Sequence, residues 1–213
     1  QFTESVVALS GGQLWLGLGL VAVAALILGM GLPVTAAYIV LSVMTAPALQ
    51  ELGLTLITAH MIIFWLSQTS NVTPPIALAA FAGAGIAGAP PMRSAVEAFK
   101  LASGLFVIPL MMAYAPLLLN GENDWGDVLF AAVLTLGLIV TIAMLSERYL
   151  FDVVTLPYVA AGFIAIVLLL VPATPVQFAG IALVLAMAWL NYRASRKKIN
   201  PQPVNHDPTR GSQ

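Results

Sequence analysis

Apolar residues fill most of the chain in long runs, and helix-breaking segments interrupt two of the runs. The first break is Gly29-Met30-Gly31-Leu32-Pro33, and the second is Ser67-Gln68-Thr69-Ser70-Asn71-Val72-Thr73-Pro74-Pro75. In hydrocarbon an unpaired backbone N–H or C=O costs several kcal/mol, so non-helical chain persists at membrane depth where it lines a site or cavity. A pair of such breaks is typical of the ion and substrate site of a secondary transporter.

The apolar runs on either side of each break predict the membrane topology. Around the first break, two arms of roughly 16 residues give about 24 Å of helix each, which is short for a core of about 30 Å. We therefore predict a re-entrant hairpin over 13–49, since one kinked helix of that length is too long for a single crossing. Around the second break we predict one discontinuous transmembrane helix over 52–89. Four continuous spans follow at about 98–119, 127–146, 153–171 and 175–191.

Composition assigns the chain to a class. It is 60% hydrophobic and 8% charged, with a mean hydropathy of +0.97, whereas a soluble domain carries about 25% charged residues. We predict an all-α integral membrane protein. The absence of cysteine excludes disulfides and thiolate metal sites. The chain starts at Gln1 with no signal-peptide pattern, so we expect the C-terminal part of a longer protein, with a polar and disordered end after about Asn200.

The charged residues separate onto two sides if the hairpin returns to the side from which it entered. One side then holds every Lys and Arg, namely Arg93, Lys100, Arg148, Arg193, Arg196, Lys197, Lys198 and Arg210. The charged residues of the other side are all acidic: Glu4, Glu51, Glu122, Asp124 and Asp127. By the positive-inside rule the cationic side is cytoplasmic. We therefore expect a cytoplasmic C-terminus and a hairpin that opens to the outside.

The breaks offer oxygen ligands for a cation. A sodium ion takes about five or six oxygens, and carbonyls freed from helical hydrogen bonds supply them together with hydroxyl and amide side chains. Pro74 and Pro75 lack N–H groups and disfavour helix just before them, which holds the second break open. We predict an ion site from Gly29, Gly31, Thr35, Ser70, Asn71 and Thr73. A substrate-binding or gating role is predicted for Met30, Leu32, Pro33, Ser67, Thr69, Pro74 and Pro75.

The side chains within the breaks are neutral. Neither break contains Asp, Glu, Lys or Arg, and a proton-coupled carrier usually needs a buried titratable group. This absence favours a metal cation such as Na⁺ over protons. His60 is the one titratable residue in a span, and we interpret it as a hydrogen-bonded packing residue, with a proton relay as the alternative. Polar residues in spans also often only pair neighbouring helices.

The sequences at the two breaks resemble the large membrane subunit of the tripartite ATP-independent periplasmic (TRAP) transporters. The resemblance is carried by Gly29-Met30-Gly31-Leu32-Pro33-Val34-Thr35-Ala36-Ala37-Tyr38 and by Ser70-Asn71-Val72-Thr73-Pro74-Pro75-Ile76-Ala77-Leu78-Ala79. In the C4-dicarboxylate and sialic acid branch an acidic residue follows the Gly-Met, and here Gly-Leu-Pro stands instead. That makes the chain most similar to the branch with a fused small-plus-large permease and a TAXI-type binding protein. Further likeness lies in Ala84-Gly85-Ile86-Ala87-Gly88, Pro91-Met92 and Ala98-Phe99-Lys100; the match is strong over about 13–119 and weaker beyond.

The resemblance implies an elevator-type carrier built from inverted repeats, of which this chain is the second. It implies sodium-coupled import of a small organic anion, such as a dicarboxylate or glutamate, with Na⁺ and no organic cofactor. The expected partners are the bilayer, the N-terminal half of the permease, a small TRAP subunit or its fused equivalent, and a periplasmic TAXI-type binding protein, but no nucleic acid. The expected location is a bacterial or archaeal cytoplasmic (inner) membrane. The expected parts are an extracytoplasmic lead-in (1–12), the hairpin (13–49), the discontinuous helix (52–89), a cytoplasmic connection with one span (90–119), the C-terminal spans (127–191) and a basic, disordered cytoplasmic tail (192–213).

Two other functions stay open at this stage. A non-transporting anchor or assembly subunit would tolerate loss of the polar breaks. An intramembrane hydrolase would need Ser67 or Ser70 as nucleophile and His60 as base. His60 precedes Ser67 by seven residues, which is roughly 10 Å along a helix, and a nucleophile and its base need hydrogen-bond contact. We therefore do not expect an enzyme.

Overall fold

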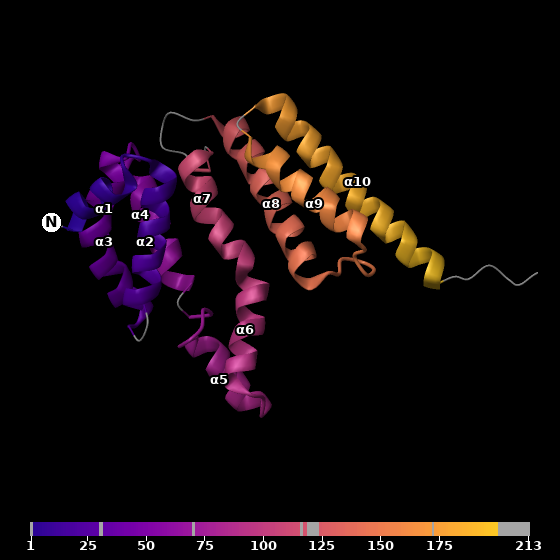
Figure 1. Ribbon diagram of the computed structural model, residues 1–213, viewed down its shortest axis with the longest axis horizontal. Helices are drawn as coiled ribbons and strands as arrows, with labels where there is room; N and C mark the ends of the chain where they lie inside the picture. Colours follow the sequence, from indigo (N-terminus) through magenta and orange to yellow (C-terminus); the bar gives the residue numbers. More distant parts are fainter. Residues whose placement is uncertain are drawn as a thin grey trace, which may run out of the picture.

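The computed structural model describes residues 2–29, 32–69, 71–115, 117–118, 124–171 and 173–199, and this part of the chain is helical (Figure 1). Its β structure is one isolated bridge, between Tyr149 and Val153. The elements are α1 (Phe2–Ser10), α2 (Leu14–Gly29), α3 (Val34–Glu51), α4 (Leu56–Thr69), α5 (Leu78–Ala87), α6 (Pro91–Leu101), the 3₁₀-helix η1 (Ala102–Phe106), α7 (Val107–Tyr114), α8 (Trp125–Glu147), α9 (Leu156–Leu170) and α10 (Thr174–Ile199).

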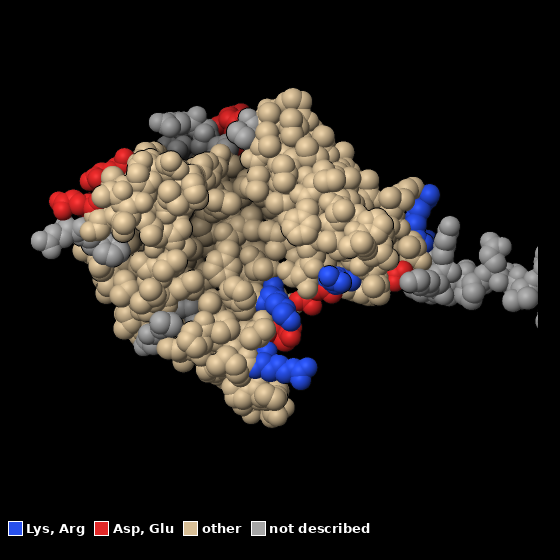
Figure 2. Space-filling view, viewed as in Figure 1, with Lys and Arg blue, Asp and Glu red and all other residues tan. Residues whose placement is uncertain are grey.

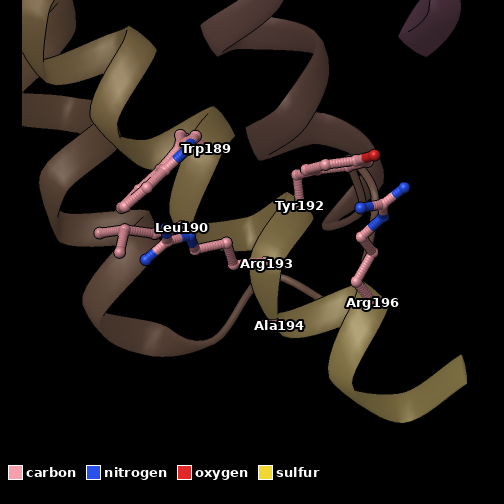
Figure 3. Close-up of a pocket in the computed structure, with 6 residues that line it drawn as sticks. All are labelled: Trp189, Leu190, Tyr192, Arg193, Ala194 and Arg196. Atoms are coloured by element: carbon pink, nitrogen blue, oxygen red, sulfur yellow. The ribbon is translucent and has the colours of Figure 1, made fainter. Parts of the chain in front are cut away.

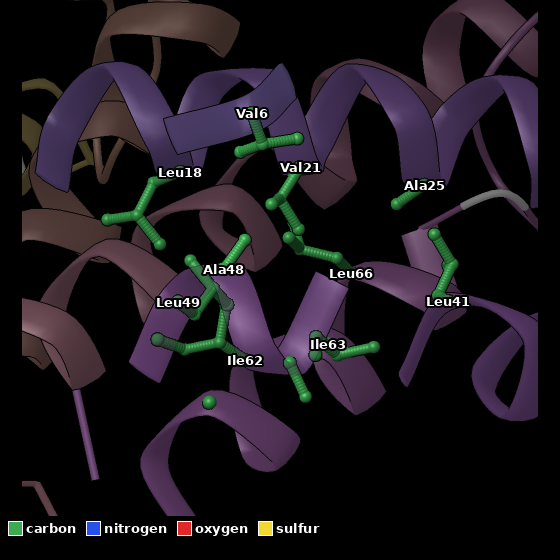
Figure 4. Close-up of a cluster of buried hydrophobic side chains, with 12 residues drawn as sticks. Val6, Leu18, Val21, Ala25, Leu41, Ala48, Leu49, Ile62, Ile63 and Leu66 are labelled. Atoms are coloured by element: carbon green, nitrogen blue, oxygen red, sulfur yellow. The ribbon is translucent and has the colours of Figure 1, made fainter. Parts of the chain in front are cut away.

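Helices α1 to α4 form the first bundle. Helices α2 and α3 pack against each other, α4 packs against both, and α1 packs against α2 and α3. Their apolar side chains meet in a core that includes Val21, Leu41, Ile62 and Ile63, all fully buried (Figure 4). The short α1 gives no separate signal in the sequence, because its nine residues continue the surrounding polar and apolar pattern.

The turn between α5 and α6 depends on glycine and proline. Gly88 ends α5 in the left-handed conformation (φ 64°), which glycine adopts without a Cβ clash, and its N–H donates to the Ala84 carbonyl. Pro91 then opens α6 at a position where its missing N–H costs nothing. The α6 helix therefore begins before the apolar run that predicted a span from residue 98.

One long helical crossing joins the two halves of the molecule. It runs through α6, η1 and α7 from Pro91 to Tyr114, so it also ends earlier than the predicted 119. Within η1, a Cβ added to Gly104 would lie 2.9 Å from Cγ2 of Ile139, so α8 lies very close to this segment. On its two sides α7 contacts different cores, the α1–α4 core and a second core shared with α8, α9 and α10.

Helices α8, α9 and α10 form the second bundle, on the right in Figure 1. Asp124 and Asp127 form a reciprocal capping box at the start of α8, and Leu138 and Leu169 lie at the centre of the shared core. The α10 helix continues to Ile199. That corrects the expected disordered tail: residues 192–199 are helical, because the Arg- and Lys-rich sequence contains strong helix formers and no Gly or Pro before Pro201.

The described helices fit an all-α, multi-pass membrane protein. Four of them are long and apolar enough to cross a bilayer: 34–51, 91–114, 125–147 and 174–196. The apolar helices α2, α4, α5 and α9 are shorter. Figure 2 shows the Lys and Arg side chains at the lower and right edges of this view, and Asp and Glu, without Lys or Arg, at the upper left and top. This separation agrees with the two-sided charge pattern in the sequence.

Candidate functional site

The second break is held in a defined shape by backbone hydrogen bonds. Helix α4 ends at Thr69 and α5 begins at Leu78. The Asn71 N–H donates to the Gln68 carbonyl (3.2 Å), and the Asn71 carbonyl accepts from the Ala79 N–H (3.1 Å). Asn71 therefore ties the end of α4 to the start of α5 through its main chain.

Hydroxyl groups at the break donate to backbone carbonyls. Ser67 Oγ donates to the Phe64 carbonyl (2.7 Å), Thr69 Oγ1 to the Leu66 carbonyl (2.7 Å), and Thr73 Oγ1 to the Thr69 carbonyl (2.6 Å). A hydroxyl has one proton and two acceptor lone pairs. Because the protons of Thr69 and Thr73 are already used, the oxygen lone pairs are the part of these two groups that a cation could use.

The first break joins α2 to α3. Gly29 is buried at the end of α2, Leu32 and Pro33 are exposed, and Pro33 is extended (φ −57°, ψ 145°) just before α3 begins. The Pro33 carbonyl accepts the first helical bond, from the Ala37 N–H (2.9 Å). Three predicted site residues, Met30, Gly31 and Ser70, lie outside the described residues.

A cavity of about 400 Å³ lies between the ends of α3 and α4 that adjoin the breaks. Thr35 lies in the first turn of α3, two residues after the first break, and Gln68 lies in the last turn of α4, inside the second. The cavity is lined by Val34, Thr35, Tyr38, His60, Met61, Phe64 and Gln68. The hollow thus reaches Gln68 of the second break and Val34 and Thr35, which directly follow the first break.

Among the described residues, four polar side chains line the cavity. Those of Tyr38 and His60 are hydrogen-bonded to each other, and the other two belong to Thr35 and Gln68. Tyr38 Oη and His60 Nδ1 lie 3.0 Å apart, and the two rings meet edge to face with centroids 6.2 Å apart. A neutral pair of this kind has two polar protons and uses one in the mutual bond. One donor therefore remains, on the imidazole or on the phenol according to the tautomer. No Asp, Glu, Lys or Arg is among the described lining residues.

Among the predicted site residues that the structure describes, only Thr35 lines the cavity. Ser67 and Thr69 are buried beside it in the last turns of α4, while Asn71, Thr73, Pro74 and Pro75 follow in the break. Our predicted site did not include Tyr38 or Gln68. Gln68 could have been found from its place among the polar residues of the break, whereas Tyr38 had no signal except its place in the first motif.

The helix ends at the two breaks carry partial charges of opposite sign. A helix carries a partial negative charge at its C-terminal end and a partial positive charge at its N-terminal end. The first break follows the C-terminal end of α2 and precedes the N-terminal end of α3, and the second stands in the same way between α4 and α5. Each break can therefore serve a cation on one side and an anion on the other.

The hydrogen bonds do not support the hydrolase arrangement for Ser67, while the other candidate nucleophile, Ser70, lies outside the described residues. Ser67 Oγ donates to the Phe64 carbonyl on its own helix, and His60 Nδ1 is engaged by Tyr38. Among the described residues no group of three or more His, Cys, Asp or Glu side chains is placed to hold a metal ion. The oxygens available at the site are hydroxyl, amide and backbone oxygens, a donor set that suits a hard monovalent cation.

Comparison with known proteins identifies the family of the part of the chain that contains both breaks. Residues 1–119 match the family model described as "Tripartite ATP-independent periplasmic transporter, DctM component". No curated protein and no solved structure matches the chain. The matched region ends after α7, so α8, α9 and α10 lie beyond it.

Proposed function

The chain belongs to the family of the tripartite ATP-independent periplasmic transporter, DctM component, and from this premise we propose that it takes part in sodium-coupled import of a small organic anion. The family is a transporter family, and its permeases are embedded in the membrane and work with a periplasmic binding protein and a small subunit. A dicarboxylate or glutamate is the proposed cargo.

Sodium is proposed to bind at the C-terminal ends of α2 and α4. There the partial negative charge of the helix end favours a cation. Gly29 and Gly31 would contribute from the first break, and Ser70, Asn71 and Thr73 from the second. The hydroxyl of Thr73, whose proton already bonds to the Thr69 carbonyl, is oriented to offer lone pairs to the ion.

The carboxylate of the cargo is proposed to bind at the N-terminal ends of α3 and α5. Free N–H groups and the positive end of the dipole favour an anion there. Thr35, in the first turn of α3, and Gln68, in the last turn of α4, line the cavity and can donate hydrogen bonds. Leu32, Pro33, Pro74 and Pro75 would then form the walls that control access.

The proposed transport movement is of the elevator type, with the chain as the second of two inverted repeats. In this proposal α2 and α3 form a re-entrant hairpin that opens to the periplasm, and α4 with α5 makes one crossing. Two separate apolar cores bridged by α7 support a division into a moving and a static part. The Lys- and Arg-rich side and the C-terminus would face the cytoplasm of a bacterial or archaeal cell.

The proposed delivery partner is a TAXI-type periplasmic binding protein. The motif support is Gly-Leu-Pro in place of an acidic residue after Gly29-Met30. In that branch the small and large permease subunits are fused, and α8 to α10, which lie beyond the matched family region, suit such an extended chain. The N-terminal half of the permease would supply the other half of the substrate site.

The observation that supports the proposal is a cavity that lies beside the two oxygen-rich breaks, with Thr35 and Gln68 in its wall and no charged residue among the described residues that line it. The test is uptake by the complete permease in proteoliposomes, with the binding protein outside, under an imposed sodium gradient or an imposed proton gradient. Sodium alone is expected to drive uptake, and potassium in its place should not. Uptake driven by protons alone would contradict the sodium site and direct attention to His60.

A further inference from the structure

A second hollow, far from the breaks in the sequence, lies along the last turns of α10. It has a volume of about 670 Å³ and is lined by Trp189, Leu190, Tyr192, Arg193, Ala194 and Arg196 (Figure 3). The guanidinium of Arg193 lies over the Trp189 ring, with Cζ 3.6 Å from the ring centroid. That of Arg196 lies 5.4 Å from the centroid of Tyr192. Each of the two cations therefore lies over the aromatic ring four residues before it on the same helix.

The chain holds this end of α10 in place through Asn191. This side chain is only 1% exposed, and its Oδ1 accepts from the backbone N–H groups of Phe151 (2.8 Å) and Asp152 (2.9 Å). Its amide nitrogen donates to the Asp152 carbonyl (3.3 Å). The Phe151 and Tyr192 rings add an edge-to-face contact at 5.4 Å. The loop between α8 and α9 thus fixes the helix end that carries the arginines.

The two arginines keep their charge available. Both are exposed, and no acidic side chain of the described residues forms an ion pair with either of them. A guanidinium that stacks on an aromatic face directs its N–H groups outward from its edge, where they match the geometry of a phosphate. The next residues in the sequence, Lys197 and Lys198, add positive charge.

The position of the two arginines along α10 indicates that a phosphate bound there belongs to a membrane lipid. The apolar part of the helix leads directly into the cluster, and Trp189 and Tyr192 are 50% and 41% exposed. Exposed Trp and Tyr at the end of a span lie at headgroup depth, and Lys and Arg just beyond a span attract anionic lipids. Leu190, which is 49% exposed, offers an apolar surface next to the cations.

We propose that this arginine–aromatic cluster is a binding site for an anionic phospholipid, with the lipid phosphate on Arg193, the upper acyl chain along Leu190 beside it, and Arg196 adding positive charge on the neighbouring side of the helix (Figure 3). A phospholipid can contact the arginines and the apolar side chain of Leu190 at the same time, because it joins a phosphate to acyl chains at the depth where the cluster lies. A free phosphate would use the arginines alone. The site is separate from the breaks and does not rest on the proposed transport function.

The test is native mass spectrometry of the complete, delipidated permease titrated with phosphatidylglycerol or with phosphatidylcholine of the same acyl chains. We expect affinity for phosphatidylglycerol to fall about fivefold in Arg193→Gln or Arg196→Gln and about thirtyfold in the double variant. The control is Arg93→Gln with Lys100→Gln, which removes two charges from α6 and should change affinity less than twofold. Thermal unfolding in neutral detergent checks that each variant is folded.

A lysine variant and a competition with free phosphate distinguish lipid binding from nonspecific attraction and from binding of free phosphate. Arg193→Lys should bind phosphatidylglycerol with intermediate affinity, because charge remains while the stacked fork is lost. Equal loss in the cluster variant and the α6 control would overturn the proposal, as would equal binding of phosphatidylcholine. Displacement of the lipid by millimolar inorganic phosphate would also overturn it, since the site would then take free phosphate.

Discussion

Replacing Thr73 by Val separates a structural role of this hydroxyl from a role as sodium ligand. The hydroxyl donates to the Thr69 carbonyl (2.6 Å), and the same carbonyl also accepts from the Val72 N–H (3.2 Å). Valine keeps the branched shape and removes the oxygen. The carbonyl stays bonded to Val72, so no buried group loses its last partner.

The two roles predict effects of different size. Loss of one hydrogen bond inside a membrane protein costs on average about 0.6 kcal/mol and at most about 1.7 kcal/mol. Loss of a contact to a charge costs about 1.5–3 kcal/mol, which corresponds to about a 10- to 150-fold rise in the sodium dissociation constant. We predict both effects in Thr73→Val: a small fall in the free energy of unfolding and a loss of sodium affinity of at least tenfold.

The assay is direct binding of radioactive sodium to the complete purified permease. Thr73→Ser, which keeps the oxygen, should restore affinity to within a few-fold of wild type. The matched control is Thr141→Val in α8, because Thr141 is 1% exposed and its hydroxyl also donates to a carbonyl four residues earlier (2.7 Å). The control should lose similar stability and no sodium affinity. Wild-type sodium affinity in Thr73→Val would refute the assignment of Thr73 as a ligand.

Three further substitutions test the described packing. Asn191→Ala removes three hydrogen bonds of a buried side chain, so the free energy of unfolding should fall by about 2–4 kcal/mol; unchanged thermal unfolding would contradict it. Gly104→Val forces a side chain against Ile139 and should cost about 1–3 kcal/mol, with Gly104→Ala milder; equal stability of all three proteins would show that η1 and α8 are farther apart. Tyr38→Phe combined with His60→Leu in a double-mutant cycle should give a coupling of about 0.6–1.7 kcal/mol, and strict additivity would mean that the pair does not form.

Local chemistry made the two breaks predictable from the sequence. Pro33, Pro74 and Pro75 lack the N–H that a helix interior needs, and each also constrains the residue before it. Helix α2 accordingly ends at Gly29, and α4 ends at Thr69. A single proline is not sufficient, because Pro47 lies inside α3. The breaks combine proline with neighbouring glycines or with a run of polar residues.

The start of the long crossing was less predictable, because hydropathy and helix formation do not coincide there. Residues 91–101 form α6 although they include Arg93, Glu97 and Lys100, and Glu97 pairs with Lys100 at 3.0 Å. An apolar run therefore marks the part of a helix that meets lipid or core, while the helix itself begins earlier at Pro91.

Contacts between distant residues could not be predicted from local patterns. Tyr38 and His60 are 22 residues apart, and Asn191 and Phe151 are 40 apart. Each pair comes into contact only after its helices pack, and the sequence near each residue does not indicate which distant residue it will contact. Our predicted site for that reason consisted of the two breaks and lacked the cavity wall between them.

The central proposal is that the two breaks come together and bind sodium beside the cavity lined by Thr35 and Gln68, and a cysteine pair tests it most directly. The chain has no cysteine, so Thr35→Cys with Gln68→Cys introduces the only two thiols of this region. In the complete permease in membranes, we predict that a short thiol-reactive cross-linker joins them, and that sodium slows the reaction while potassium does not. Cross-linking at the same rate in sodium and in potassium, or no cross-linking in either, would contradict the claim.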